Sequence, residues 1–178
     1  NTFADNGWKG DLVVLNLINE TYLNNISDNV NLVVLNVNHT RYSFVPLLKY
    51  LYQNKIKSCL VFNHELAVTL VILRFLFRLE IKIISRNISV LSIKIKQFEK
   101  KNIWKRYVVR PLVTYFYQKV DHVVNQCHSM RNDLVRVYPQ LYNDSSVIYN
   151  PISIYFENYI KKNDISKIEK KNYLLCVG

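Results

Sequence analysis

Residues 117–150, YQKVDHVVNQCHSMRNDLVRVYPQLYNDSSVIYN, decide the fold that we expect of this chain. The apolar run at 121–126 predicts a strand, and SVIYN at 146–150 predicts another. Between them, Ser129 is expected to cap a helix that Pro139 stops. A strand, a helix and a strand in this order are typical of a right-handed βαβ unit in a parallel sheet.

The same alternation runs through the rest of the chain. Further strands are expected at 31–37, 58–62 and 81–85, because continuous β-branched and apolar runs indicate strands covered on both faces. A first helix is expected at 12–22, because Leu12, Leu15, Ile18 and Tyr22 have helical spacing. Three more helices are expected at 45–52, with Ser43 as its cap, at 65–78, and at 92–119. The last of these should be broken near Pro111, because proline disrupts a helix interior. The sequence therefore predicts an α/β fold, a three-layer αβα Rossmann-like domain with a mostly parallel sheet.

The pattern also predicts a domain organisation. Residues 1–151 are expected to form the Rossmann-like domain, the polar stretch 152–172 a linker, and YLLCVG at 173–178 the first strand of a further domain. Because the chain opens on a loop and an expected helix, we also expect a first strand of the sheet to be missing.

Charge and composition bound the partners. The net charge of +11, from 24 Lys and Arg against 13 Asp and Glu, favours nucleic acid, phosphorylated small molecules or an anionic membrane. The three widely spaced cysteines have no zinc-ligand spacing and fit a reducing cytosol, so no metal site is predicted. The most apolar run, 66–79, includes Arg74 and Arg78 and is shorter than the roughly 20 residues that span a bilayer.

Ligands of open α/β sheets bind outside the carboxyl ends of the strands, so we inspect the residues that follow each strand. His64 and Glu65 follow the run at 58–62, where a His beside a carboxylate could donate to a hydroxyl or act as its base. Arg86 and Asn87 follow the next strand, and Arg offers a fork for phosphate or carboxylate. The competing interpretation is a helix-start Glu with an incidental His, and a surface Arg.

Two other segments are candidates for anion binding. The opening loop, Gly7, Trp8, Lys9 and Gly10, precedes the first expected helix and could present a helix N-terminus to a phosphate, or it could be a plain flexible loop. The expected helix at 92–119 mixes basic and aromatic residues and could lie on an anionic leaflet, contact nucleic acid, or be a core helix with a solvated basic face. Its membrane candidates are Lys100, Lys101, Trp104, Lys105 and Arg106.

With these segments placed, the chain resembles the amino-terminal half of a GT-B glycosyltransferase, closest to the retaining family 4 type of bacterial surface polysaccharide synthesis. NGWKGDLVVLNLI at 6–18 is similar to that family's Gly-Gly-x-Glu-Arg loop and following helix, although Trp8 stands where the second Gly is usual. The segments at 43–63 and 120–139 resemble its helix–strand and strand–helix continuations, and SVIYNPI at 146–152 resembles its crossover to the second domain.

The resemblance implies transfer of a sugar from a nucleotide-sugar donor to a lipid-linked or saccharide acceptor, with no cofactor and no obligatory metal. It implies that Gly7 faces the donor phosphates, that His64 and Arg86 line the acceptor side, and that Asn150 and Pro151 form the hinge. A paired-Glu motif would belong to the missing carboxyl-terminal domain, so this chain alone is expected to be inactive. The expected location is cytoplasmic, on the inner face of the cell membrane, with no nucleic acid partner.

Two alternatives remain open from the sequence. A basic, non-enzymatic α/β module could bind nucleic acid or an anionic membrane. A related GT-B enzyme such as a nucleotide-sugar epimerase should carry catalytic carboxylates in this half, and the sequence offers no convincing pair.

Overall fold

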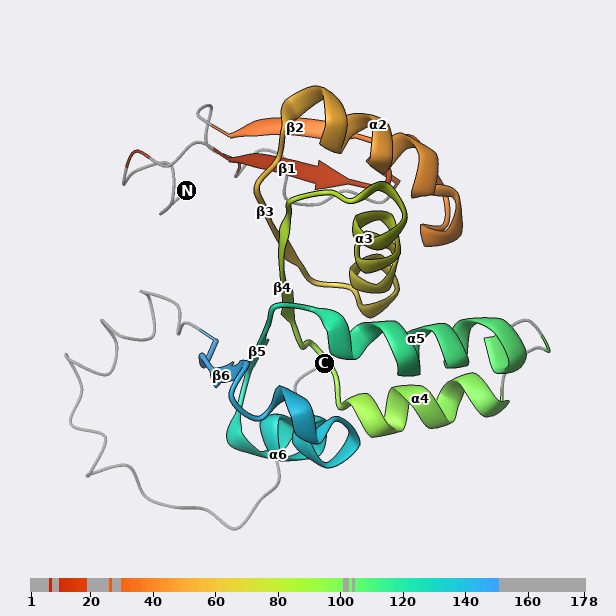
Figure 1. Ribbon diagram of the computed structural model, residues 1–178, viewed down its shortest axis with the longest axis vertical. Coiled ribbons are helices and arrows are strands. Elements are labelled where there is room, and N and C mark those ends of the chain that lie inside the picture. Colours follow the sequence, from red (N-terminus) through yellow and green to blue (C-terminus); the bar gives the residue numbers. More distant parts are fainter. Residues whose placement is uncertain are drawn as a thin grey trace, which may run out of the picture. The chain divides into compact units, whose positions relative to one another are not determined.

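The computed structural model describes residues 7, 10–18, 26, 30–100, 103 and 105–150, the side chains of 98–100 and 105 excepted (Figure 1). The chain divides into two units, Asn1–Ile148 and Tyr149–Gly178. The description below concerns the first unit. The expected linker 152–172 and the expected strand 173–178 lie outside the described residues.

Strands and helices alternate through the first unit. The strands are β1 Asp11–Val14, β2 Asn31–Val34, β3 Ser58–Val61, β4 Lys82–Arg86, β5 His122–Asn125 and β6 Ser145–Val147. The helices are α2 Phe44–Asn54, α3 His64–Phe77, α4 Leu91–Lys100, α5 Arg110–Phe116 and α6 His128–Val137. Shorter turns are the 3₁₀ segments η2 Thr40–Tyr42, η4 Tyr117–Lys119 and η5 Pro139–Leu141, and the π-helical η3 Lys105–Val109.

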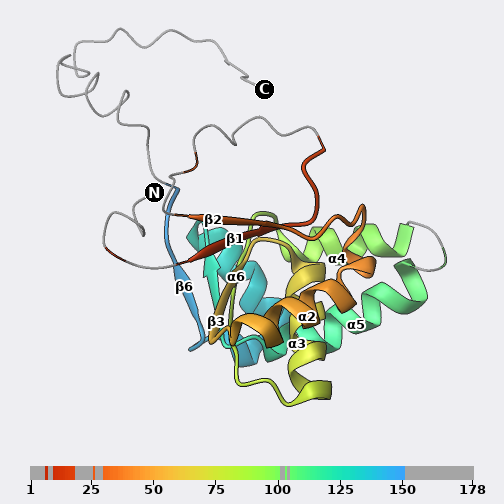
Figure 2. The same cartoon turned by 90° about the horizontal axis from the view of Figure 1, so that it is seen from above.

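The strands form parallel sheets, as the βαβ pattern predicts. One sheet has the order β3-β4-β5-β6, and β1 pairs with β2 in a second, two-stranded sheet. Every strand pair is parallel. Helix α3 packs on β3 and β4, and α4 lies beside α5 (Figures 1 and 2). The predicted Rossmann-like three-layer α/β fold is confirmed.

The expected helix at 12–22 is wrong at its start, because Asp11–Val14 forms strand β1. The pentapeptide LVVLN occurs at 12–16 and again at 32–36, and the two copies pair in register, Leu12 with Leu32 and Val14 with Val34. The β-branched Val13 and Val14 favour the strand over the helix. This strand also removes the premise for expecting a missing first strand.

The residues that precede the helices differ in whether their side chains cap the helix start. The side chain of Asn63 caps α3, accepting hydrogen bonds from the backbone N–H groups of Glu65 at 2.8 Å and Leu66 at 3.3 Å. Ser43 precedes α2 as predicted, but its hydroxyl donates to the Thr40 carbonyl and does not cap the helix. Cys127, not Ser129, occupies the cap position of α6.

The expected break near Pro111 is not a break of the helical backbone. The π-helical segment η3 ends at Val109, whose own backbone is helical, and α5 follows directly with Pro111 in its first turn. The helix therefore changes type just before Pro111 and continues through it. The apolar run at 66–79 forms most of α3, and no helix in the described ranges is long and apolar enough to cross a membrane.

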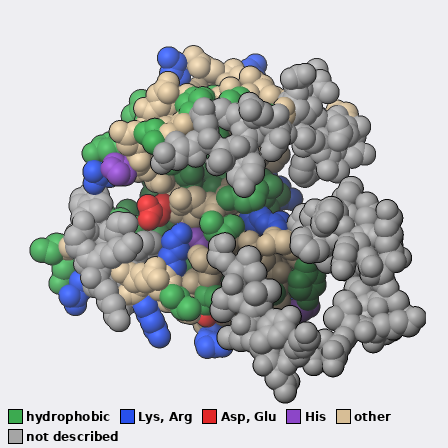
Figure 3. Space-filling model, turned by 180° about the vertical axis from the view of Figure 1, so that it is seen from behind, with side chains coloured by type: hydrophobic (Ala, Val, Ile, Leu, Met, Phe, Trp, Pro, Cys, Tyr) green, Lys and Arg blue, Asp and Glu red, His purple; other side chains and the backbone are tan. Residues whose placement is uncertain are grey.

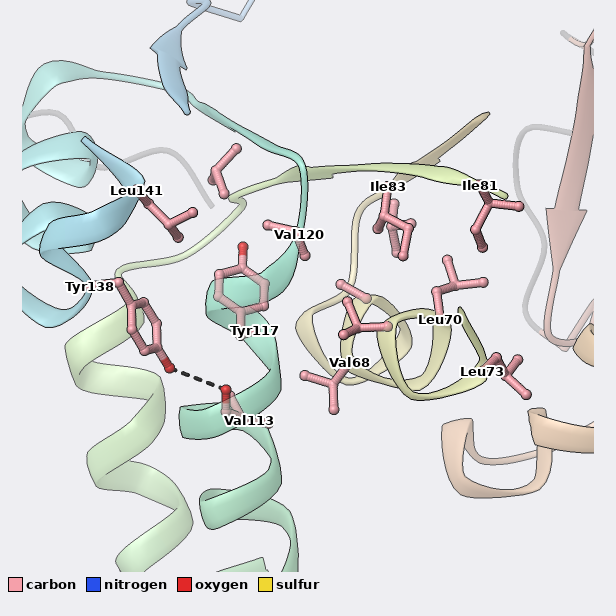
Figure 4. Close-up of a cluster of buried hydrophobic side chains, with 14 of the residues drawn as sticks. Val68, Leu70, Leu73, Ile81, Ile83, Val113, Tyr117, Val120, Tyr138 and Leu141 are labelled. Atoms are coloured by element: carbon pink, nitrogen blue, oxygen red, sulfur yellow. Dashed lines mark hydrogen bonds between the residues drawn. The ribbon is translucent and has the colours of Figure 1, made fainter. Parts of the chain in front are cut away.

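The apolar core lies between α3 and the four-stranded sheet and continues to α5 and α6 (Figure 4). Leu73 of α3 and Ile83 of β4 are each 0 % exposed. At the other end, Tyr138 donates a hydrogen bond from its Oη to the carbonyl of Val113 at 3.2 Å, which ties the end of α6 to α5. This buried hydroxyl is satisfied, so the ring can fill the core.

We expect Leu73→Ala to lower the free energy of unfolding by about 2–5 kcal/mol, because it removes a fully buried side chain and leaves a cavity. Urea unfolding monitored by circular dichroism measures the change. Leu76→Ala is the matched control, since Leu76 is on the same helix but 59 % exposed and should change stability by less than about 0.5 kcal/mol. Equal losses in the two variants would contradict the assigned core.

Candidate functional site

Buried polar side chains converge at the carboxyl ends of β3, β4 and β5. His64 follows β3, Asn87 follows β4, and Asn125 ends β5. The His64 Nε2 lies 2.8 Å from the Asn87 Oδ1, and the Asn87 Nδ2 donates to the Asn125 Oδ1 at 2.7 Å. Each of the three residues is at most 1 % exposed. Parallel strands end at one edge of the sheet, so the topology itself brings these residues together.

Tyr117 and Ser85 complete this polar cluster. The Tyr117 Oη donates to the Asn87 Oδ1 at 2.9 Å, so the Ser85 Oγ, 2.8 Å from the Tyr117 Oη, is the donor of that second bond. The Asn125 Nδ2 donates to the carbonyl of Ser146 at 3.2 Å. Burial raises the pKa of the Tyr117 hydroxyl, which therefore stays protonated and able to donate.

Lys94 of α4 joins the cluster through the other ring nitrogen of His64. Its Nζ lies 3.2 Å from the His64 Nδ1. An ammonium can only donate, so the His64 Nδ1 is the acceptor and the hydrogen of the neutral ring is on Nε2, aimed at Asn87. Burial first, and then the neighbouring Lys94 charge, lower the pKa of His64 to about 4. His64 is therefore neutral at pH 7.

A depression beside Lys94 provides space for a ligand. It has a volume of about 350 Å³ and is lined by Ser89, Val90, Ile93, Lys94 and Gln97. The Ser89 Oγ is buried and has no hydrogen-bond partner within the described part of the chain. Buried hydroxyls are normally paired, so this atom lacks the partner that such a position usually has. The ammonium of Lys94 and the amide of Gln97 on α4, with the hydroxyl of Ser89 just before this helix, suit an anionic, oxygen-rich group.

Basic side chains predominate over acidic ones on one face of the molecule. Lys and Arg side chains are spread over the described part of the face seen in Figure 3, where acidic side chains are few. The acidic Asp133 is buried on α6, where its carboxylate accepts a hydrogen bond from the backbone N–H of Ser92 at 3.0 Å. That bond caps the first turn of α4 and fixes this helix against α6.

The structure brings together only part of the predicted acceptor side. His64 and Asn87 are in direct contact. Glu65 is half-buried in the first turn of α3, where it contributes the backbone N–H capped by Asn63. Arg86 is the half-buried last residue of β4.

The predicted anion site at the opening loop does not have the expected geometry. Gly7 has a φ of 77°, but strand β1 rather than a helix follows Gly10, so this loop has no helix N-terminus to offer. Trp8 and Lys9 lie outside the described residues. The donor-facing role predicted for Gly7 and Gly10 therefore loses its structural basis.

The structure describes only some of the remaining predicted residues. Asn150 is exposed, whereas Pro151, Lys101 and Trp104 are outside the described residues. Lys100 ends α4 and Lys105 begins η3, but their side chains are not described. The Arg106 guanidinium is exposed and lies 5.4 Å from the centre of the Tyr107 ring.

Sequence reasoning missed Lys94, Tyr117, Ser85, Ser89 and Asn125. Asn125 ends a strand, so the rule that selected Asn87 could have found it. Lys94 and Tyr117 reach the cluster from helical segments far along the chain, and no local pattern marks them.

Within the described residues, no three His, Cys, Asp or Glu side chains gather as a metal site. A scan against models of protein families found no match, and a search among curated proteins found no relative. The fold and the buried cluster define an α/β protein of the Rossmann-like class with a polar site at the carboxyl edge of its sheet.

The buried imidazole predicts a pH dependence of stability. The unfolded chain binds a proton at His64 below about pH 6.5, whereas the native chain does not until about pH 4, so stability should fall as the pH falls through this window. The full difference is about 3 kcal/mol from this group. We expect the His64→Gln variant, which cannot titrate, to lose that part of the slope in urea unfolding between pH 6.5 and 5. A His64 imidazole that titrates near pH 6.5 by NMR would contradict the buried, neutral assignment.

Proposed function

We propose that this chain is the acceptor-binding, Rossmann-like domain of a glycosyltransferase. The complete enzyme would transfer a sugar from a nucleotide-sugar to a lipid-linked or saccharide acceptor in the synthesis of a bacterial surface polysaccharide. The observation that carries the proposal is the cluster of His64, Asn87 and Lys94 beside a ligand-sized depression at the carboxyl edge of a parallel sheet. The resemblance to the GT-B family supplies the class of reaction.

In this proposal Lys94 contacts the acceptor, and His64 holds Lys94. Both ring nitrogens of His64 are engaged and the residue is 1 % exposed, so it positions the ammonium and does not touch the acceptor. The Lys94 ammonium and the Ser89 hydroxyl would bind phosphate or sugar oxygens, because both can donate hydrogen bonds. The nucleotide-sugar would bind mainly to the carboxyl-terminal domain that the resemblance implies.

The proposal places the enzyme at the cytoplasmic face of a membrane, where lipid-linked acceptors are found. The basic excess of the chain supports an anionic surface as partner. Lys100, Lys101, Trp104, Lys105 and Arg106 stay the predicted membrane residues of the basic segment.

Binding of a short-chain polyprenyl pyrophosphoryl sugar to the whole chain tests the proposed site. We expect Lys94→Met to weaken binding about tenfold or more, because it removes a charge-assisted hydrogen bond. Lys96→Met is the matched control, since Lys96 is exposed on the same helix and does not line the depression. Isothermal titration calorimetry measures both variants, with inorganic pyrophosphate as a second ligand that separates phosphate recognition from sugar recognition.

The proposal fails if the two variants bind alike, or if the wild-type chain does not bind the pyrophosphoryl sugar. It also fails if the chain binds a nucleotide-sugar more tightly than the acceptor, because the donor would then be the ligand of this domain.

A further inference from the structure

The end of α3 exposes successive apolar side chains. Phe75 is 75 % exposed, Leu76 is 59 % exposed and Phe77 is 38 % exposed. Runs of three or more exposed apolar residues are avoided on protein surfaces unless they contact something. The last turn of α3 also projects beyond the neighbouring elements (Figure 2).

An aromatic side chain of α2, Tyr52, also belongs to this surface. The Tyr52 Oη donates to the carbonyl of Phe77 at 3.4 Å, and the Tyr52 side chain is itself 55 % exposed. The Phe77 ring also lies 6.3 Å from the Phe44 ring, measured between ring centres, which anchors the turn to α2. The exposed residues are therefore held on a rigid pair of helix ends.

Basic residues lie at the same end of the sheet as the last turn of α3, where α2 and α3 end and β3 and β4 begin. Lys55 and Arg78 follow the last residues of α2 and α3, and both are exposed. Lys57 and Lys82 are exposed at the starts of β3 and β4, where the backbone N–H of Lys82 donates to the carbonyl of Lys57 at 2.8 Å. Of the acidic residues nearby, Asp121 pairs with Arg74. Glu80 is exposed between Arg78 and Lys82 in the sequence, so the basic residues stay in excess.

We propose that this surface binds an anionic lipid bilayer. We name it the amino-end patch, because it lies where strands β3 and β4 begin. It consists of Tyr52, Lys55, Lys57, Phe75, Leu76, Phe77, Arg78 and Lys82. Phe75 and Leu76 would enter the boundary between headgroups and acyl chains, and Tyr52 would lie at headgroup depth. Each Lys or Arg near an anionic leaflet strengthens binding severalfold.

The apolar residues decide between a bilayer and a nucleic acid. A phosphate backbone would attract the four basic residues equally well, but it offers no apolar phase to the Leu76 side chain. A bilayer satisfies both kinds of side chain at once. The patch is independent of sugar transfer, and it lies at the opposite end of α3 from His64, about 20 Å away for a helix of this length.

Co-sedimentation of the whole chain with vesicles tests the amino-end patch. The probe is phosphatidylcholine with about one-third phosphatidylglycerol, compared with pure phosphatidylcholine. We expect binding to the anionic vesicles, and at least about tenfold weaker binding for the double variant Phe75→Ser/Leu76→Ser. Val45→Ser is the matched control, because Val45 is 70 % exposed near the start of α2 and lies outside both the patch and the basic segment 100–106. It should bind as the wild-type chain does.

A second measurement detects directly whether residue 75 enters the bilayer. In a Phe75→Trp variant, the added indole emission should shift to shorter wavelength on anionic vesicles and be quenched by spin-labelled lipid, relative to the wild-type background. The proposal is overturned if the double variant binds like the wild-type chain, or if the added indole is not quenched. Loss of vesicle binding in the Val45→Ser variant alone, or binding to duplex DNA in place of vesicles, would overturn it as well.

Discussion

The carboxamide of Asn87 is the group on which the organisation of the sheet edge depends. Its oxygen accepts from His64 and Tyr117, and its nitrogen donates to Asn125, so one side chain after β4 joins the start of α3, the end of β5 and η4. In a dry interior, each of these groups would cost about 1–3 kcal/mol if left unpaired. The cluster therefore permits one arrangement of the strand ends, and the hydrophobic core alone would tolerate several.

Helix α3 connects the polar cluster to the hydrophobic core and to the surface at the other end of the sheet. Its first residue, His64, belongs to the polar cluster, its middle fills the core with residues such as Leu73, and its last turn exposes Phe75. In the proposed function with the proposed membrane contact, the site would stand about one helix length, roughly 20 Å, from the bilayer. A lipid-linked acceptor would then have to extend from the bilayer to reach such a site.

The sequence was sufficient for most strands and for the fold class, because β-branched runs and their alternation with helices are local signals. It failed at 12–22, where the helical spacing of Leu12, Leu15 and Ile18 competed with a strand signal from Val13 and Val14. The deciding information was non-local: the second LVVLN copy at 32–36 is the partner of the first. Register between distant strands is set by such pairing, and no periodicity within one segment contains it.

The same limit applies to the candidate site. His64 and Asn87 could be predicted because they follow strands of one sheet, and the topology then brings them together. Tyr117 and Lys94 could not, since their place in the cluster depends on how α4 and α5 pack after the chain has folded. A strand-end rule therefore finds the part of a site that the sheet builds and misses the part that the covering helices add.

The helical part of the site sets its charge. Burial disfavours a charged imidazole at His64, and a protonated ring would also place two cations 3.2 Å apart, so both effects lower the pKa of His64 and keep the ring neutral. At neutral pH the pair consequently carries one positive charge, on the member that lines the depression. The neutral imidazole, itself held by the buried amide of Asn87, orients the ammonium beside the depression. In the proposed function, a phosphate-bearing acceptor would meet that positive charge.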